Sequence, residues 1–108
     1  MIATVYAVFA NMEEAERIAV IVVEEGLAAC ANIMAPCRSI YRWEGKIERA
    51  EEVPALFKTA RQEALIARIA ELHSYEIPAV MAWPIENAHQ PYAEWITASV
   101  PPSGAHPR

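Results

Sequence analysis

The chain has 108 residues, enough for one domain with a modest core, and we expect a single domain over residues 1–100 followed by a disordered tail over 101–108. Its net charge of −5 comes from fourteen glutamates, without any aspartate, against nine lysines and arginines, and this balance argues against a nucleic-acid-binding protein. No apolar run reaches the roughly 18 residues of a membrane span and the N-terminus lacks the basic opening of a secretory signal, so we expect a cytoplasmic protein without membrane contact.

The first quarter of the chain predicts a strand followed by a helix. Residues 2–9 are apolar almost without a break, which is typical of a strand inside a sheet. Asn11 is a favourable helix N-cap, Glu14 follows three residues later as in a capping box, and apolar residues then recur at helical spacing. Gly26 is expected to end this helix as the residue after its C-cap.

One long hairpin is predicted over residues 30–59, with its turn at 43–46. Both arms carry β-branched and aromatic residues, and Gly45 supplies the positive φ of a tight turn. Pro36 is expected to mark a bulge in the first arm, because proline cannot donate to the strand ladder. For the same reason we expect an irregularity at Pro54, in an arm that would be central in the sheet.

The length of this hairpin suggests an oligomer. Each arm of roughly 13 residues would be on the order of 43 Å long, whereas a compact globule of this size is roughly 34 Å across. The hairpin should therefore overhang its own domain and expose strand edges that another chain can pair with. The apolar content of 55%, against a usual value of roughly 45–50%, also indicates surfaces buried between subunits.

The rest of the chain completes an α+β pattern. A helix is predicted over residues 61–73, a strand over 76–82 and a short final helix over 91–99. The order strand, helix, strand, strand, helix, strand is that of the ferredoxin-like βαββαβ sandwich, in which two helices cover one face of a four-stranded antiparallel sheet. The extra C-terminal helix follows this unit.

The residues of common catalytic sites are mostly missing. Three glycines leave no phosphate-binding loop and no dinucleotide fingerprint, and the absence of aspartate excludes a Ser–His–Asp triad. Cys30 and Cys37 do not have a zinc-site spacing, and we interpret both as small buried hydrophobic residues. We therefore expect a protein that is not an enzyme and requires no cofactor.

Two pairs of polar residues remain as candidate binding sites. His73 and Glu76 lie three residues apart across the end of a helix, where imidazole and carboxylate suit copper, zinc or nickel; a histidine favourably placed at a helix C-terminus is the alternative. Lys58 and Arg61 precede that helix and form a candidate anion site, or else a solvated charge pair at a strand end. Core or interface packing is the expectation for the aromatic residues Tyr41, Trp43, Trp83 and Trp95.

Four segments together resemble the CutA divalent-cation tolerance family. Residues 39–47 match its S-x-Y-x-W-x-G-K-I hairpin, and residues 27–33 match its L-A-A-C-x-N-I segment. Residues 72–78 are similar to its L-H-P-Y-E-x-P motif, and residues 92–96 to its closing Y-x-x-W-I. The resemblance covers nearly the whole chain and implies a ferredoxin-like homotrimer with the architecture of the PII signalling proteins, together with metal tolerance and copper binding.

The copper ligands proposed for some members of that family are partly replaced here. Those members carry a cysteine at the end of the first strand and two consecutive histidines at the end of the second helix. The matching residues are Phe9, Leu72 and His73, so one histidine remains and the soft thiolate best suited to Cu(I) is absent. The trimer-forming hairpin is intact.

Two functions are expected from these observations. The first is a homotrimeric cation-tolerance protein that binds copper or zinc weakly through His73, with help from Glu76 or a neighbouring subunit. The second is a PII-like sensor that binds an anionic metabolite in clefts between subunits. In that case Lys58 and Arg61 would meet the anion, and the cleft would be lined by Tyr41, Trp43 and Tyr75.

Overall fold

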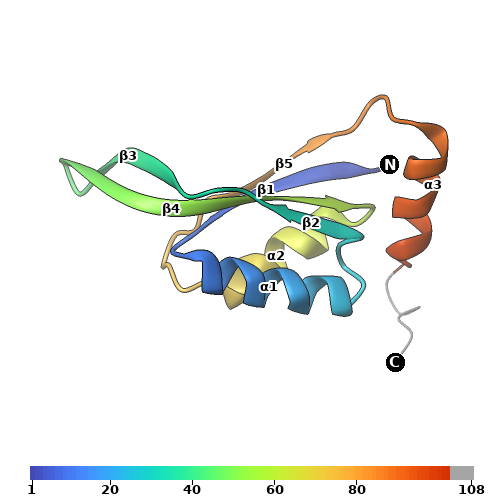
Figure 1. The fold of residues 1–108 in the computed structure, drawn as a ribbon, viewed down its shortest axis with the longest axis horizontal. Coiled ribbons are helices and arrows are strands. Elements are labelled where there is room, and N and C mark those ends of the chain that lie inside the picture. The colour runs from blue at the N-terminus through green and yellow to red at the C-terminus, as the bar shows by residue number, and fades with distance from the viewer. Residues whose placement is uncertain (103–108) are drawn as a thin grey trace.

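The computed structural model describes residues 1–102, and within them it contains five strands and three helices (Figure 1). The elements in chain order are β1 (Ala3–Phe9), α1 (Met12–Glu24), β2 (Cys30–Ile33), β3 (Cys37–Trp43), β4 (Lys46–Thr59), α2 (Gln62–Leu72), β5 (Val80–Pro84) and α3 (Gln90–Ser99). The strands form one antiparallel sheet in the order β2-β4-β1-β5, with β3 paired to the other half of β4. The predicted ferredoxin-like α+β fold is confirmed.

Helices α1 and α2 lie side by side against one face of the sheet (Figure 1). Alternate strand residues point to this face and are fully buried, as Val5, Phe9 and Phe57 illustrate. Within the described residues, no helix covers the opposite face, where Met81 and Trp83 of β5 stay about half exposed. The sheet therefore has one packed face and one open, partly apolar face.

Helix α1 begins and ends with the expected capping residues. Asn11 is the N-cap, and its Oδ1 accepts the N–H of Glu14 at 2.9 Å. The Glu14 carboxylate does not return to Asn11 as in a full capping box; it accepts the N–H of Ala10 instead. At the other end Gly26 has a φ of 74°, and the N–H of Leu27 reaches back to the carbonyl of Val22 at 2.9 Å, as in a Schellman motif.

The β3–β4 hairpin projects beyond both helices (Figure 1). Its turn places Glu44 and Gly45 at φ values of 51° and 82°, between the paired residues Trp43 and Lys46, as a two-residue type I′ turn requires. The molecule is 44 Å long against 30 and 22 Å in the other directions. The predicted overhang of the hairpin is confirmed.

The irregularity expected at Pro54 lies in the facing arm instead, so its predicted position is wrong. Strand β4 runs without a break through Pro54, which pairs with Val8. Val8 donates its N–H to the carbonyl of Ala79, on the side away from β4. Val8 and Pro54 are therefore a pair without hydrogen bonds between them, and the missing N–H of Pro54 is not needed there. The missing N–H faces residues 34–36, where the first arm is interrupted at Pro36 between β2 and β3.

The later elements agree with prediction except for one strand. Arg61 and His73 are the caps of α2, and α3 lies within a residue of its predicted bounds. Strand β5 begins at Val80 rather than at residue 76, because the chain bends over residues 74–77 before it enters the sheet. The predicted disordered tail lies outside the described residues from position 103 onward.

Candidate functional site

A pocket of about 470 Å³ lies between the β3–β4 hairpin and the bend that follows α2. Three of its lining side chains are aromatic and two are carboxylates: Tyr41, Trp43, Tyr75, Glu52 and Glu76. The pocket thus contains four of the residues singled out from the sequence, and Glu52 in addition.

Strand pairing places the hairpin residues of this pocket. Ser39, Tyr41 and Trp43 alternate along β3 and therefore point to the same side. Glu52 is paired with Cys37 across the ladder, so it shares that side. The opposite wall is the bend after α2, which brings Tyr75 and its neighbour to the hairpin.

The hydroxyl of Tyr75 joins the two walls. It donates to Oε2 of Glu52 at 2.7 Å, although the two residues belong to different elements. Burial and this hydrogen bond raise the pKa of Tyr75 above its usual value, so the hydroxyl remains the donor and Glu52 the acceptor. Sequence reasoning missed Glu52, because it is one of several glutamates in a charged stretch and nothing local marks it.

His73 is held inside the protein by both of its ring nitrogens. Nε2 lies 2.7 Å from the carbonyl oxygen of Val8, which can only accept, so Nε2 carries the proton. Nδ1 accepts the N–H of Tyr75 at 3.1 Å. The ring also stacks on Phe9 with centroids 5.2 Å apart, and the side chain has no exposed surface. Phe9 and His73, the two positions that match copper ligands in some family members, therefore do lie together in space. In this chain they form a stacked aromatic pair.

Glu14 fastens the same bend to the start of α1. Its two carboxylate oxygens accept the N–H groups of Ala10 at 2.9 Å and Ser74 at 2.8 Å. Burial alone would raise the pKa of Glu14, but the hydrogen bonds from Ala10 and Ser74 and the nearby His73 together lower it. The sequence identified Glu14 as a helix-start residue without showing that it holds a segment sixty positions away.

The donor set does not fit a resident, tightly bound metal ion. In the described residues, no group of three or more histidine, cysteine or acidic side chains could hold one. His73 and Glu76 form no hydrogen bond or ion pair with each other in this part of the chain, and Glu76 is exposed at the pocket. Metal binding through His73 would require breaking one of its two hydrogen bonds, so the assignment of this pair stays a prediction.

Lys58 and Arg61 lie at the other end of β4. Lys58 donates to Oδ1 of Asn32 on β2, and Arg61 lines a separate hollow at the start of α2. Lys58 lies six positions after Glu52, about 20 Å further along β4. Within one chain the predicted anion-binding pair is therefore apart from the aromatic residues of the pocket, and a cleft containing all of them would need a second subunit.

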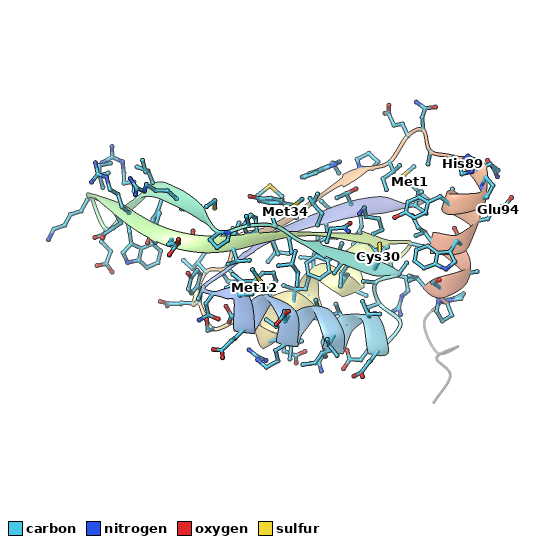
Figure 2. The ribbon with its side chains drawn as sticks, in the orientation of Figure 1. Met1, Met12, Cys30, Met34, His89 and Glu94 are labelled. Atoms are coloured by element: carbon cyan, nitrogen blue, oxygen red, sulfur yellow. The ribbon has the colours of Figure 1, made fainter. Side chains whose placement is uncertain are left out.

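The two cysteines were expected to be buried, and both are partly exposed and unpaired. Cys30 lies beside α3 (Figure 2), where its Sγ is 3.5 Å from the hydroxyl of Tyr92. This hydrogen bond, together with burial, raises the pKa of Tyr92 to about 12. Cys30 thus contributes to the contact between β2 and α3.

Comparison with known proteins agrees with the resemblance. The family model for the CutA1 divalent ion tolerance protein matches residues 3–99. The chain belongs to the CutA1 family. The CutA divalent-cation tolerance protein of Pyrococcus horikoshii is 39% identical over 94 residues, which cover 85% of this chain and 91% of that protein.

Two further comparisons extend this assignment. Protein CutA of Mus musculus is 42% identical over 101 residues, but the match covers 87% of this chain and 56% of the longer mouse protein. The structure of the CutA1 divalent cation tolerance protein of Thermus thermophilus has a TM-score of 0.89 at 35% identity, covering 94% of this chain and 100% of that chain. The Pyrococcus and Thermus proteins are named for cation tolerance and not for a reaction. In the described part of our CutA1-family chain, no helix has the length and apolarity needed to cross a membrane.

Proposed function

We propose that this CutA1-family protein is a cytoplasmic homotrimer that binds copper or zinc weakly and exchangeably and catalyses no reaction. The observation that carries the proposal is the charge of the pocket. Glu52 and Glu76 both line it, and the side chains around them include no lysine or arginine. Carboxylate oxygens and imidazole nitrogens are suitable ligands for zinc and copper.

Glu76 and His73 are the proposed ligands. Glu76 is exposed. His73 becomes available for a metal ion when the hydrogen bond from the N–H of Tyr75 to Nδ1 breaks. Losing such a hydrogen bond costs about 1 kcal/mol, and this cost is subtracted from the free energy of metal binding. The absence of a cysteine at Phe9 removes a further ligand. The broken hydrogen bond and the missing ligand both support weak, reversible binding of the metal ion.

The exposed apolar surface supports the homotrimer. On the hairpin, Ile40 is 62% exposed and Trp43 41%, and on the open face of the sheet Trp83 is 45% exposed. Side chains of this size are usually covered in the functional assembly when they form continuous surfaces. A neighbouring subunit at the hairpin would also bring further ligands to the pocket.

Calorimetric titration with Cu²⁺ tests the metal proposal. His73→Gln keeps a donor for the carbonyl of Val8 but lacks the imidazole, and Glu76→Gln removes one carboxylate. We expect each variant to bind copper about tenfold more weakly, the loss of one good ligand interaction. His89→Ala, at the histidine that precedes α3 and is not one of the proposed ligands, is the control and should bind as the wild type does. Equal copper affinity in the wild type and the three variants would show that neither His73 nor Glu76 is a ligand.

The sensor of an anionic metabolite is the second candidate. Its supporting observation is that Lys58 and Arg61, three residues apart, both lie where β4 passes into α2. A thermal-shift screen of metals and metabolites separates the two functions. Stabilisation by an anion that is lost in Lys58→Ala would favour the sensor, whereas stabilisation by copper or zinc alone would favour metal binding.

A further inference from the structure

The pocket beside the hairpin combines aromatic rings with negative charge. Tyr41, Trp43 and Tyr75 surround it, and each ring keeps part of its surface exposed. Glu52 and Glu76 lie among these rings. Aromatic faces attract organic cations through the ring quadrupole, and carboxylates pair with ammonium groups by charge-assisted hydrogen bonds. This is a different chemistry from the coordination of a metal ion by imidazole and carboxylate groups.

Glu52 provides a second, independent observation. The residue is only 8% exposed, yet its carboxylate has a single hydrogen bond in the described residues, the one from the hydroxyl of Tyr75 to Oε2. Oε1 has no such partner in that part of the chain. Oε1 is not sealed inside the protein, because the described residues contain no buried side-chain oxygen without a partner, so it is open to a ligand from the pocket. An ammonium group there would pair with a carboxylate that is otherwise mostly removed from water. No salt bridge to Glu52 is formed among residues 1–102.

We propose that this pocket binds a small organic ammonium ion, of the class of short alkyl diamines. An ammonium group would lie between Glu52 and Glu76, and the methylene carbons would pack on the rings of Tyr41 and Trp43. A volume of about 470 Å³ is sufficient for such a ligand and is within the usual range for small-molecule sites. The proposal goes beyond metal binding, because it assigns the pocket an organic ligand and does not involve His73.

Three four-carbon probes that differ chiefly in charge test the proposal. They are 1,4-diaminobutane, 1,4-butanediol and succinate, titrated into the full chain by calorimetry in the presence of EDTA. We expect the diamine to bind at least about tenfold more tightly than the neutral diol, since a charge-assisted hydrogen bond exceeds a neutral one by roughly that factor. Succinate should bind most weakly. Equal binding of the diamine and the diol, or preferential binding of succinate, would overturn the proposal.

Substitutions locate the bound diamine. Glu76→Gln, at an exposed residue that the fold does not depend on, should weaken diamine binding about tenfold, and Trp43→Leu should weaken it by a smaller factor. Glu86→Gln changes the net charge equally but lies outside the pocket, so its affinity should equal that of the wild type. If Glu86→Gln weakened binding as much as Glu76→Gln did, the diamine would be responding to net charge and the pocket would not be its site. EDTA removes metal from this experiment, so its failure would leave the copper titration unaffected.

Discussion

His73, Glu14 and Tyr75 show how single residues shape this site. His73 holds the bend after α2 by hydrogen bonds to Val8 and Tyr75. Glu14 holds the same bend by accepting the N–H of Ser74. Tyr75 then reaches Glu52 on the hairpin. The motif that led us to expect a metal ligand is therefore, in one chain, mainly a set of structural hydrogen bonds. Within this motif, Tyr75, Glu76 and Ile77 line the pocket and His73 does not.

Glu14 makes stability depend on pH. Its folded-state pKa is lowered from the ordinary value of 4.5, so its contribution is fully present above that value and is lost as pH falls through the depressed folded pKa. In Glu14→Gln this acid-dependent loss should disappear. At neutral pH the variant should be less stable by about 1–3 kcal/mol, because two backbone donors lose a charged acceptor.

Urea denaturation at several pH values between about 3 and 7 measures the effect of Glu14→Gln. Glu13→Gln is the matched control, since Glu13 is exposed and belongs to the same first turn of α1. The wild type and the control should lose stability together below about pH 4.5, where an ordinary carboxyl group begins to bind its proton. Parallel pH profiles for the wild type and Glu14→Gln would show that this carboxylate has no special role.

At the scale of elements, α3 stands apart from the main core. Its Ile96 is fully buried in a small cluster with Ala29 and Val100, against which Ile2 and Ala60 also pack. The main core instead lies between the sheet and the helices α1 and α2. Because this second cluster is small, the docking of α3 depends on very few side chains.

Ile96→Ala should release α3 from the end of the sheet. Removing a buried isoleucine costs about 2–5 kcal/mol, and here the loss falls on a cluster with few other contacts. Hydrogen exchange should show the amides of α3 losing protection while those of α1 keep theirs. Glu94→Ala is the control, because Glu94 points away from the rest of the molecule (Figure 2) and should change stability by under about 0.5 kcal/mol. Uniform destabilisation of both helices would contradict an independently docked α3.

At the scale of the whole molecule, the shape and the exposed apolar surface are the features that favour association with further chains. The hairpin extends the long dimension to 44 Å, and the open face of the sheet has no covering helix among the described residues. A sheet edge and an apolar face that are left uncovered favour association with further copies. The proposed trimer would cover both.

Sedimentation equilibrium at micromolar concentration should give about three times the chain mass of 12.0 kDa. If unfolding is reversible and coupled to dissociation, the melting temperature should rise with protein concentration. Trp43 is 41% exposed in the single chain. If a neighbouring subunit covers its ring, Trp43→Ala should lower the melting temperature, since losing a tryptophan buried in this way costs roughly 3–5 kcal/mol per contact. A folded monomer at these concentrations would overturn the trimer. A trimeric Trp43→Ala variant with unchanged melting temperature would show that the hairpin tip is not an anchor.

The sequence by itself determined the order of the elements, the caps of α1 and the position of the hairpin turn. These depend on signals within a few residues: helical spacing, Asn11 as N-cap, and glycine where φ is positive. It also identified the family, because each of the four motifs is a short, unbroken run of residues. The overhang of the hairpin followed from counting residues, since strand length is proportional to residue number.

The tertiary structure alone decided what the candidate site contains. Strand pairing and the bend after α2 bring Glu52 within hydrogen-bonding distance of Tyr75. Nothing in the sequence around either residue indicates this contact. The same holds for His73, whose nitrogens are occupied by groups that the sequence does not place near it. Strand register and side-chain hydrogen bonding depend on contacts between distant segments. For that reason the sequence could predict the fold but could not tell which polar side chains face the pocket and which are buried inside the protein.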